Sequence, residues 1–333
     1  MTEQLNQLPG IAVVGAGYWG VNHVRNFYQL GALQTVCDAN IASLQKISET
    51  FPDVNIETDF EKVLADSAIQ GVVIATPAES HFRLASRALK AGKHLLVEKP
   101  LTLNVEEGEQ LVALAGEQQR VLMVGHLLEF HPAVLRLREF IESGELGELH
   151  YIYSNRLNLG KIRREENILW SFAPHDIAII LRLVGELPSR VSATGGAYLQ
   201  PQIADVTVTN MEFPHGTRAQ IFVSWLHPYK EQRMVIVGSK KMAVFDDVRK
   251  ENKLMTYEHV IEFVEGEPVM KKGEGIPVEL ESAEPLKREC QHFLECIQTG
   301  KQPLTDGESG VRVLRILEAA EQSLEQQGAP VAL

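Results

Sequence analysis

The chain has 333 residues, a length that predicts two domains rather than one or five. Hydrophobic residues make up 44% of the sequence and charged residues 23%, values close to those of globular proteins, which excludes wholesale disorder. With neutral histidines the net charge is 32 − 44 = −12. A charge of that sign argues against a nucleic-acid-binding protein and against a protein of the membrane surface.

The sequence also bears on membrane insertion, secretion and cysteine chemistry. Apolar runs such as GVVIA at 71–75 are too short to span a bilayer, and the first residues, MTEQLNQLPG, lack the basic and apolar regions of a secretory signal. The three cysteines, Cys37, Cys290 and Cys296, form no C-x-x-C motif, so we expect neither a disulfide nor a zinc site. Together these features predict a cytoplasmic, soluble enzyme.

Short apolar runs alternate with helical patterns in the first third of the chain. Continuous apolar strands separated by helices are typical of a parallel sheet that is covered on both faces. We expect the strands at 11–15, 33–38, 54–57, 71–75, 93–98 and 121–125. Six such strands predict a doubly wound, dinucleotide-binding domain over residues 1–124.

The pattern of predicted elements changes in residues 125–333, where strands follow one another without a helix between each pair. The segment 217–225 alternates between two faces, which is typical of a half-buried strand. We expect further strands at 233–238 and 241–247, and helices at 132–143, 174–184, 284–298 and 307–326. Pro174 suits the first turn of its helix, and 264–283 is the most loop-like part. The pattern predicts an α+β domain with a largely antiparallel sheet.

The run GAGYWG follows the first strand and opens the first helix. Gly15 permits a tight turn, Gly17 lets a pyrophosphate approach the backbone, and Gly20 lets helix and strand pack closely. Asp38 ends the second strand, where its carboxylate can accept hydrogen bonds from both ribose hydroxyls, and no basic residue follows it to receive a 2′-phosphate. This favours NAD over NADP; glycines that merely serve a tight turn are the alternative. The expected cofactor-binding residues of this loop are Gly15, Gly17, Tyr18, Trp19 and Gly20.

Two later strand ends add further candidates for the cofactor site. Ala75, Thr76 and Pro77 end the fourth strand, on the edge where such sheets bind ligands, and His81 lies just beyond. For Thr76, a role as an ordinary helix cap is an alternative of equal weight to cofactor binding.

The fifth strand ends in Glu98, Lys99 and Pro100. Because Lys99 precedes a proline, its backbone is held extended, which gives its ammonium group a fixed starting point. Oxidising an alcohol requires the hydroxyl proton to be removed as hydride leaves carbon, and a partly desolvated lysine can polarise or deprotonate that oxygen.

The runs VVGAGYWG, ATPAESH and LLVEKPL, in this order and spacing, resemble the glucose–fructose oxidoreductase/inositol dehydrogenase (Gfo/Idh/MocA) family. The resemblance covers essentially the whole chain. It implies an N-terminal Rossmann domain, a C-terminal α/β domain with an open, mainly antiparallel sheet, and oxidation or reduction of ring hydroxyls of sugars or polyols with a nicotinamide cofactor. It also implies that Lys99 and His175 share proton transfer and alcohol positioning, and that Glu98 and Lys99 border the nicotinamide.

Two positions depart from the pattern of the family. Many members have an aspartate four residues before the histidine and another three residues after it, whereas this chain has Ser171 and Ala178. A serine can bind the substrate but cannot act as a base near neutral pH, so the proton acceptor must be His175 or Lys99. Asp176 points about 100° away on a helix and is interpreted as structural.

The most basic stretch of the chain is 155–164. Its cations suit an anionic substrate such as a nucleotide diphosphate or a uronate, with a solvated loop neutralised by nearby acids as an even alternative. The residues expected to bind substrate here are Arg156, Asn158, Lys161 and Arg163.

The segment HLLEFH contains His126, Glu129 and His131, but its spacing fits no familiar zinc pattern, and we expect no metal. We expect His126 to line the substrate cleft.

Within the family, runs such as NILWSFAPHDI and SWLHPYKEQRMVIVG resemble the branch of nucleotide-sugar and surface-polysaccharide enzymes. The first hypothesis is therefore an NAD-dependent 3-dehydrogenase of a nucleotide-linked aminosugar or its uronate. An inositol or free-sugar dehydrogenase is the alternative enzyme, and a non-catalytic NAD-binding regulator is the alternative of another class. By analogy with the family we expect a homodimer or homotetramer.

Overall fold

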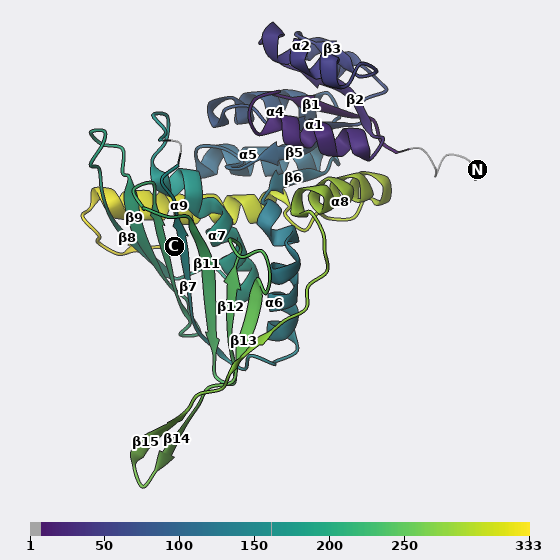
Figure 1. Ribbon diagram of the computed structural model, residues 1–333. Coiled ribbons are helices and arrows are strands. Elements are labelled where there is room, and N and C mark those ends of the chain that lie inside the picture. Colours follow the sequence, from purple (N-terminus) through teal and green to yellow (C-terminus); the bar gives the residue numbers. More distant parts are fainter. Residues whose placement is uncertain (1–7, 161) are drawn as a thin grey trace. The chain divides into compact units, whose positions relative to one another are not determined.

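A computed structural model describes residues 8–160 and 162–333, so Lys161 lies outside the described residues. The chain divides into two compact units (Figure 1). The first unit contains the residues up to Phe130 together with Glu284–Leu314, and the second contains His131–Ala283 and Arg315–Leu333.

The first unit is built on a six-stranded parallel sheet with the strand order β3-β2-β1-β4-β5-β6. This is the order of a doubly wound dinucleotide-binding fold, and all six expected strands are confirmed. The strands are β1 (Ile11–Val14), β2 (Leu33–Cys37), β3 (Asn55–Glu57), β4 (Gly71–Ile74), β5 (His94–Glu98) and β6 (Leu122–Gly125). The helical segments are α1 (Gly20–Gln29), α2 (Ile41–Thr50), α3 (Phe60–Ala65), η2 (Ala78–Ser80), α4 (His81–Lys90), α5 (Val105–Glu117), η3 (Leu127–Phe130) and α8 (Pro285–Thr299).

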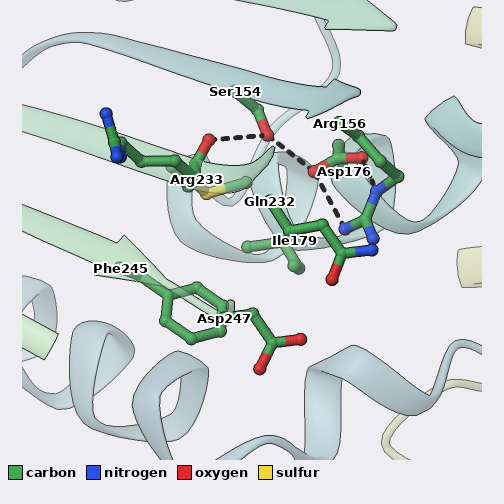
Figure 2. Close-up of a pocket in the computed structure, with 9 residues that line it drawn as sticks. Ser154, Arg156, Asp176, Ile179, Gln232, Arg233, Phe245 and Asp247 are labelled. Carbon is green, nitrogen blue, oxygen red and sulfur yellow. Dashed lines mark hydrogen bonds and ion pairs between the residues drawn. The ribbon is translucent and has the colours of Figure 1, made fainter. Parts of the chain in front are cut away.

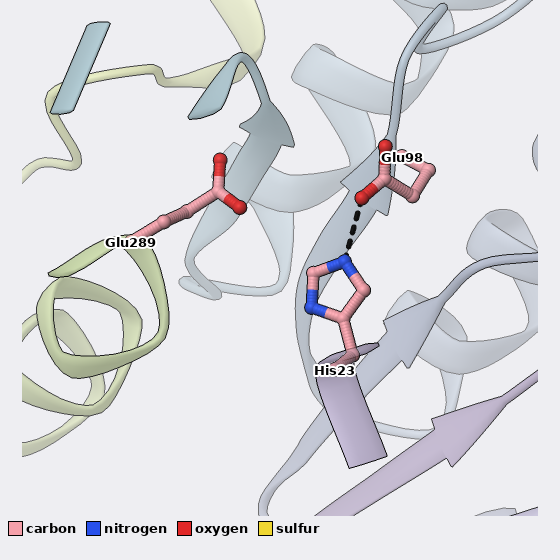
Figure 3. A group of neighbouring side chains, drawn as sticks. All are labelled: His23, Glu98 and Glu289. Carbon is pink, nitrogen blue, oxygen red and sulfur yellow. Dashed lines mark hydrogen bonds and ion pairs between the residues drawn. The ribbon is translucent and has the colours of Figure 1, made fainter. Parts of the chain in front are cut away.

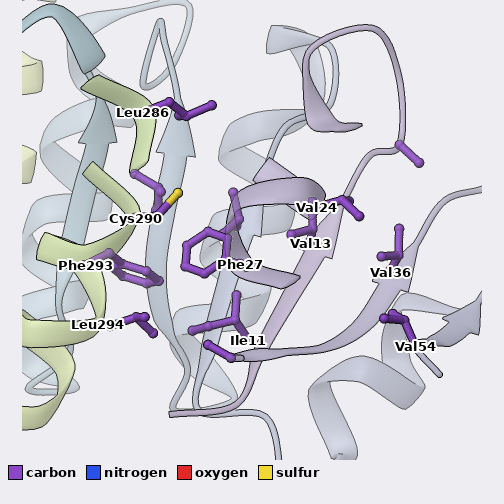
Figure 4. Packing of buried hydrophobic residues seen from close by; sticks show 14 of the residues in the cluster. Ile11, Val13, Val24, Phe27, Val36, Val54, Leu286, Cys290, Phe293 and Leu294 are labelled. Atoms are coloured by element: carbon purple, nitrogen blue, oxygen red, sulfur yellow. The ribbon is translucent and has the colours of Figure 1, made fainter. Parts of the chain in front are cut away.

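The helix α8 belongs to this unit although it is distant in sequence. Phe293 and Cys290 of α8 are fully buried in the cluster that also holds Phe27 and Val24 of α1 (Figure 4). We expected residues 125–333 to form one domain; instead the apolar face of α8 closes the core of the first unit, because burying such aromatic surface is strongly favourable.

The second unit is built on a nine-stranded sheet with the order β16-β13-β12-β11-β7-β10-β9-β8-β17, in which β7 and β10 run parallel and the other neighbours run antiparallel. The expected, mainly antiparallel sheet is confirmed. Its strands are β7 (Leu149–Leu157), β8 (Arg190–Gly196), β9 (Val206–Glu212), β10 (Arg218–Ser224), β11 (Glu231–Gly238), β12 (Met242–Asp246), β13 (Leu254–Tyr257), β16 (Gly275–Pro277) and β17 (Val331–Ala332). The predicted alternation holds for 218–223, where Ala219, Ile221 and Val223 are buried, and Trp225 is buried on the same face; it ends at Ser224, which is also buried.

Two helices of the second unit pack against its sheet: α6 (Pro132–Glu142) against β12, and α7 (Ile168–Val184) against β7, β9 and β10. The expected start of α7 at residue 174 is wrong. Asn167 caps the helix by accepting a hydrogen bond from the Trp170 backbone N–H at 3.2 Å, so Pro174 lies inside the helix rather than in its first turn. A long last helix, α9 (Gly307–Glu325), contributes its first residues to the first unit and the rest to the second. Over residues 8–160 and 162–333, no helix is long and apolar enough to cross a membrane.

The segment 264–283, expected to be most loop-like, begins with the turn and second strand of a β-hairpin. The hairpin is formed by β14 (Val260–Val264) and β15 (Glu267–Lys271) and projects away from the large sheet of the second unit (Figure 1). Its turn residues, Glu265 and Gly266, have φ angles of 53° and 87°. Positive φ at both central positions is the geometry of a two-residue hairpin turn, so the Glu-Gly pair joins two strands where composition alone predicted a loop.

Candidate functional site

The glycine-rich loop after β1 has the geometry that the sequence predicted. Gly15 has a φ of 98°, and a Cβ there would lie 2.5 Å from the Ala75 carbonyl oxygen. A Cβ at Gly20 would collide with the Gly15 carbonyl oxygen, so α1 and β1 approach closely only with glycine. At Gly17 a Cβ would meet no atom of the described residues within 4 Å, which leaves this side of the loop open. Tyr18 at the tip of the loop is 92% exposed.

Asp38 follows β2 and lies beside this loop. Its Oδ2 accepts a hydrogen bond from the Ala16 backbone N–H at 2.6 Å, and its Oδ1 accepts one from the Asn40 N–H at 2.7 Å. The carboxylate is therefore held in place and keeps lone pairs for ribose hydroxyls. An open glycine loop, a helix N-terminus without acidic residues in its first turn and this carboxylate fit the pyrophosphate and ribose of NAD.

The loop after β4 is held by His81. Its Nε2 lies 2.9 Å from the Thr76 carbonyl oxygen and its Nδ1 lies 2.8 Å from the Pro100 carbonyl oxygen, and the residue is only 1% exposed. The imidazole joins the loops after β4 and β5. That His81 binds the cofactor stays a prediction. Thr76 does not cap α4, because its hydroxyl pairs with that of Ser80 at 2.6 Å; Pro77 beside it is exposed and Ala75 partly buried.

Glu98, at the end of β5, receives several hydrogen bonds. Its Oε1 accepts from Trp19 Nε1 at 2.5 Å and pairs with His23 Nε2 at 2.6 Å, and its Oε2 accepts from the Lys99 backbone N–H at 3.2 Å. Burial alone raises the pKa of Glu98, but the hydrogen bonds from His23 and Trp19 outweigh it and hold the pKa below its usual range. The carboxylate lies against Gly125 of β6, where a Cβ would be 3.0 Å from it. Lys99 follows, partly exposed, with a cis peptide bond to Pro100.

His126, just after β6, is buried. It is 2% exposed, and within the described part of the chain neither ring nitrogen has a hydrogen-bond partner. Burial lowers the pKa of His126 to about 4, so its imidazole is neutral at physiological pH. His131, at the end of the same motif, instead caps α6 by accepting from the Ala133 N–H at 3.0 Å.

Sequence reasoning missed one residue of this region, Glu289 of α8. Its side chain points toward His23 and Glu98 (Figure 3), and the three side chains bring ligand-type atoms within 4.8 Å of one another. Glu289 is 0% exposed. Leu286 and Phe293 define the apolar face of α8, and Glu289 falls on that face, so a single charge within an apolar helical stripe was the signal that could have found it.

In the second unit, Asp176 of α7 organises a polar group beneath the sheet (Figure 2). The Arg156 guanidinium donates to its two oxygens at 2.6 and 3.2 Å, and the Ser154 hydroxyl donates at 2.6 Å. The structural interpretation of Asp176 fits this geometry. The side chain of Arg156 is 11% exposed and its charge is paired with Asp176 inside the protein, which does not favour the predicted contact with an anionic substrate.

The other basic candidates lie in the loop after β7. Arg163 has a side chain that is 43% exposed, with Glu166 Oε1 3.7 Å from its Nε. Asn158 is partly buried, and its backbone N–H donates to the Ser224 carbonyl oxygen at 3.1 Å. Lys161 lies outside the described residues.

Ser171 and His175 lie on α7. They are four residues apart and therefore share a face of the helix. Ser171 is 6% exposed, whereas His175 is partly exposed.

Comparisons with known proteins agree with this architecture. A family model described as an oxidoreductase family with an NAD-binding Rossmann fold matches residues 10–126, and the GFO/IDH/MocA C-terminal domain matches residues 134–244. The chain is 30% identical over 308 residues to the UDP-N-acetylglucosamine 3-dehydrogenase of Acidithiobacillus ferrooxidans, covering 91% of this chain and 93% of that protein. It is 26% identical over 340 residues to the scyllo-inositol 2-dehydrogenase (NAD(+)) of Bacillus subtilis, covering 97% and 95%.

A solved structure of the UDP-N-acetylglucosamine 3-dehydrogenase of Acidithiobacillus ferrooxidans has the same fold. It superimposes with a TM-score of 0.84 at 28% identity, over 95% of this chain and 97% of that one.

Proposed function

Because the chain belongs to the GFO/IDH/MocA family of NAD-dependent oxidoreductases, we propose that it oxidises the C3 hydroxyl of a nucleotide-linked aminosugar or its uronate, in nucleotide-sugar or polysaccharide biosynthesis. The observation that carries this proposal is the 30% identity to a UDP-N-acetylglucosamine 3-dehydrogenase over 91% of the chain. The open glycine loop and the anchored Asp38 carboxylate support the choice of NAD.

The proposed chemistry assigns roles to the cofactor and to three side chains. NAD, when bound, supplies the hydride acceptor. In the first unit, Lys99 receives or polarises the hydroxyl proton, with its position fixed by the hydrogen-bonded Glu98 that precedes it. In the second unit, His175 and Ser171 of α7 contact the sugar hydroxyls, and His175 is the second group able to accept a proton.

Recognition of the anionic nucleotide falls to fewer cations than the sequence predicted. Arg156 already pairs with Asp176, whereas Arg163 is exposed and its Nε lies 3.7 Å from Glu166 Oε1. An exposed guanidinium can form a bidentate contact with a phosphate or carboxylate at little desolvation cost. We therefore assign Arg163 to the substrate diphosphate or uronate.

A second candidate is a dehydrogenase of inositol or another free polyol. The observation that favours it is the buried pairing of Arg156, which removes one of the expected anion-binding cations. Similarity to a scyllo-inositol dehydrogenase over 97% of the chain is consistent with it.

A single-turnover experiment distinguishes the candidates. Purified protein and NAD are mixed with UDP-N-acetylglucosamine, its uronate, free N-acetylglucosamine and scyllo-inositol, while NADH absorbance and product mass are followed. NADH formation with the UDP-linked sugars alone supports the proposal, whereas NADH formation with scyllo-inositol supports the second candidate. If the protein binds NAD but forms no NADH with any of these compounds, a non-catalytic protein is supported.

Paired variants test the residue assignments. Lys99→Ala is expected to abolish NADH formation with every substrate, and Lys62→Ala, on an exposed lysine, is its control. Arg163→Ala is expected to raise KM for the UDP-sugar about tenfold, the loss of one charge-assisted contact. Arg164→Ala, on the exposed neighbouring arginine, should leave KM unchanged. Equal effects of the two arginine variants would contradict the assignment.

A further inference from the structure

Glu289 is a buried acid whose surroundings differ from those of the neighbouring Glu98. It is 0% exposed, and neither carboxyl oxygen has a hydrogen-bond partner among the residues that the structure describes. Glu98 accepts hydrogen bonds from His23, Trp19 and the Lys99 backbone N–H. One acid is thus solvated by protein donors and the other is not.

The charges around Glu289 decide which acid holds a proton. Glu98 of β5 and Glu129 of η3 both act on it with negative charge, and both are themselves buried. Cys290, next to it on α8, is also buried, and burial raises its pKa, so the neutral thiol adds no charge that could stabilise an ionised Glu289. Burying an ionised carboxylate without hydrogen-bond donors costs on the order of several kcal/mol. Glu289 therefore takes the neutral form.

A metal ion is a poor explanation for the group His23, Glu98 and Glu289. His23 Nε2 and Glu98 Oε1 are already bonded to each other at 2.6 Å, and Trp19 Nε1–H points at the same oxygen. A donor hydrogen aimed at that oxygen occupies the place that a cation would need. The arrangement is a hydrogen-bonded pair, His23 and Glu98, beside a separate acid.

We infer that Glu289 is a positioning residue, which as a buried neutral acid closes the last side of the Glu98 carboxylate and so holds the strand end that carries Lys99. The remaining sides of that carboxylate are covered by His23, Trp19 and Gly125. A second negative charge at Glu289 would repel Glu98 and disturb the backbone of Lys99. This role rests on the proposed function for its catalytic consequence, but the charge state of Glu289 does not.

Stability against pH tests the charge state without any substrate. Burial raises the pKa of Glu289 well above its ordinary value of 4.5, with the charges of Glu98 and Glu129 adding to the effect. The folded protein therefore binds a proton that the unfolded chain releases above pH 4.5, and stability is lost as pH rises from 4.5 toward the folded pKa. The expected contribution is about a tenfold fall in the folding equilibrium constant per pH unit.

The variant Glu289→Gln carries the same shape without the ionisable proton. Relative to it, the wild-type folding constant is expected to fall about tenfold per unit between pH 5 and 7 in urea titrations. Glu308→Gln, at an exposed position in the first turn of α9, is the matched control and should keep the wild-type slope. Identical slopes in wild type and Glu289→Gln would overturn the inference, as would stoichiometric zinc, manganese or iron that is present in the wild type and lost in Glu289→Gln.

Positioning is tested by pH profiles of kcat and of the Kd for NAD. Glu289→Gln is expected to match the wild type at pH 7 within about twofold, as a neutral isostere should. As pH rises through the raised pKa of Glu289, the wild type is expected to lose kcat and NAD affinity while Glu289→Gln does not. Superimposable profiles would reduce Glu289 to a structural residue and overturn its positioning role. If no substrate is turned over, the proposed function fails, and the profile of Kd alone still decides this inference.

Discussion

Asp176 of the second unit and Glu289 of the first are both buried carboxyl groups, at 2% and 0% exposure, yet the protein treats them in opposite ways. Asp176 receives three hydrogen bonds from Arg156 and Ser154. Glu289 receives none from the described residues and faces two other acids. Burial therefore does not set the charge of an acid by itself; the donors aimed at it decide whether it is an anion or a neutral group.

The strongest way to break this comparison is to remove the partner of Asp176. Arg156→Ala leaves a buried carboxylate without its cation, and about 3–5 kcal/mol of unfolding free energy should be lost, as for other buried pairs cut on one side. Urea denaturation measures it. Arg218→Ala, which removes an exposed ion pair with Glu212, is the control and should cost at most about 1 kcal/mol. Equal losses would mean that the Arg156 pair is no more than a surface contact.

The same chemical change, from acid to amide, should have different effects at the two positions. Asp176→Asn leaves the Arg156 guanidinium buried beside a neutral group and is expected to cost about 3 kcal/mol at pH 7. Glu289→Gln replaces a neutral acid by a neutral amide and is expected to cost nothing or to stabilise the protein at that pH. The measurement is again urea denaturation at pH 7, and equal destabilisation by both variants would contradict the contrast.

Much of the first unit could be predicted from sequence. Its strands are continuous apolar runs, its turns need glycine at Gly15 and Gly20, and these demands are local to the chain. The interpretation of Asp176 as structural also followed from a local rule, the 100° step of a helix between it and His175.

Contacts between distant segments could not be predicted from the sequence. Arg156 was predicted to bind an anionic substrate, and the sequence does not reveal that β7 lies against α7, which brings Asp176 to it. His81 was predicted to bind the cofactor, and nothing local shows that Pro100 lies against its ring. Glu289 lies 191 residues from Glu98, and only the fold brings the two acids together.

A further prediction concerns the packing of Glu98. Gly125→Ala places a Cβ 3.0 Å from the Glu98 carboxyl group, tighter than ordinary contact, and is expected to cost about 2 kcal/mol and to weaken NAD binding. Gly116→Ala, in α5, is the control, because a Cβ there meets no atom of the described chain within 4 Å; it should stabilise the protein by up to about 1 kcal/mol. Thermal unfolding and an NAD titration measure both effects. An unchanged Kd for NAD in Gly125→Ala would show that the position of the Glu98 carboxylate does not affect NAD binding.

The smallest expected effect tests whether the donors of Asp176 are equivalent. Ser154→Ala removes one neutral donor at 2.6 Å but leaves both contacts from Arg156, so the carboxylate keeps its cation. The loss should be about 1 kcal/mol, the net value of one hydrogen bond, and well below that of Arg156→Ala. Ser48→Ala, on the exposed surface of α2, serves as the control for a serine whose hydroxyl bonds only its own helix. If Ser154→Ala costs as much as Arg156→Ala, the hydroxyl stabilises the buried Asp176 as strongly as the cation does, and the contrast with Glu289 then depends on the number of donors rather than on their charge.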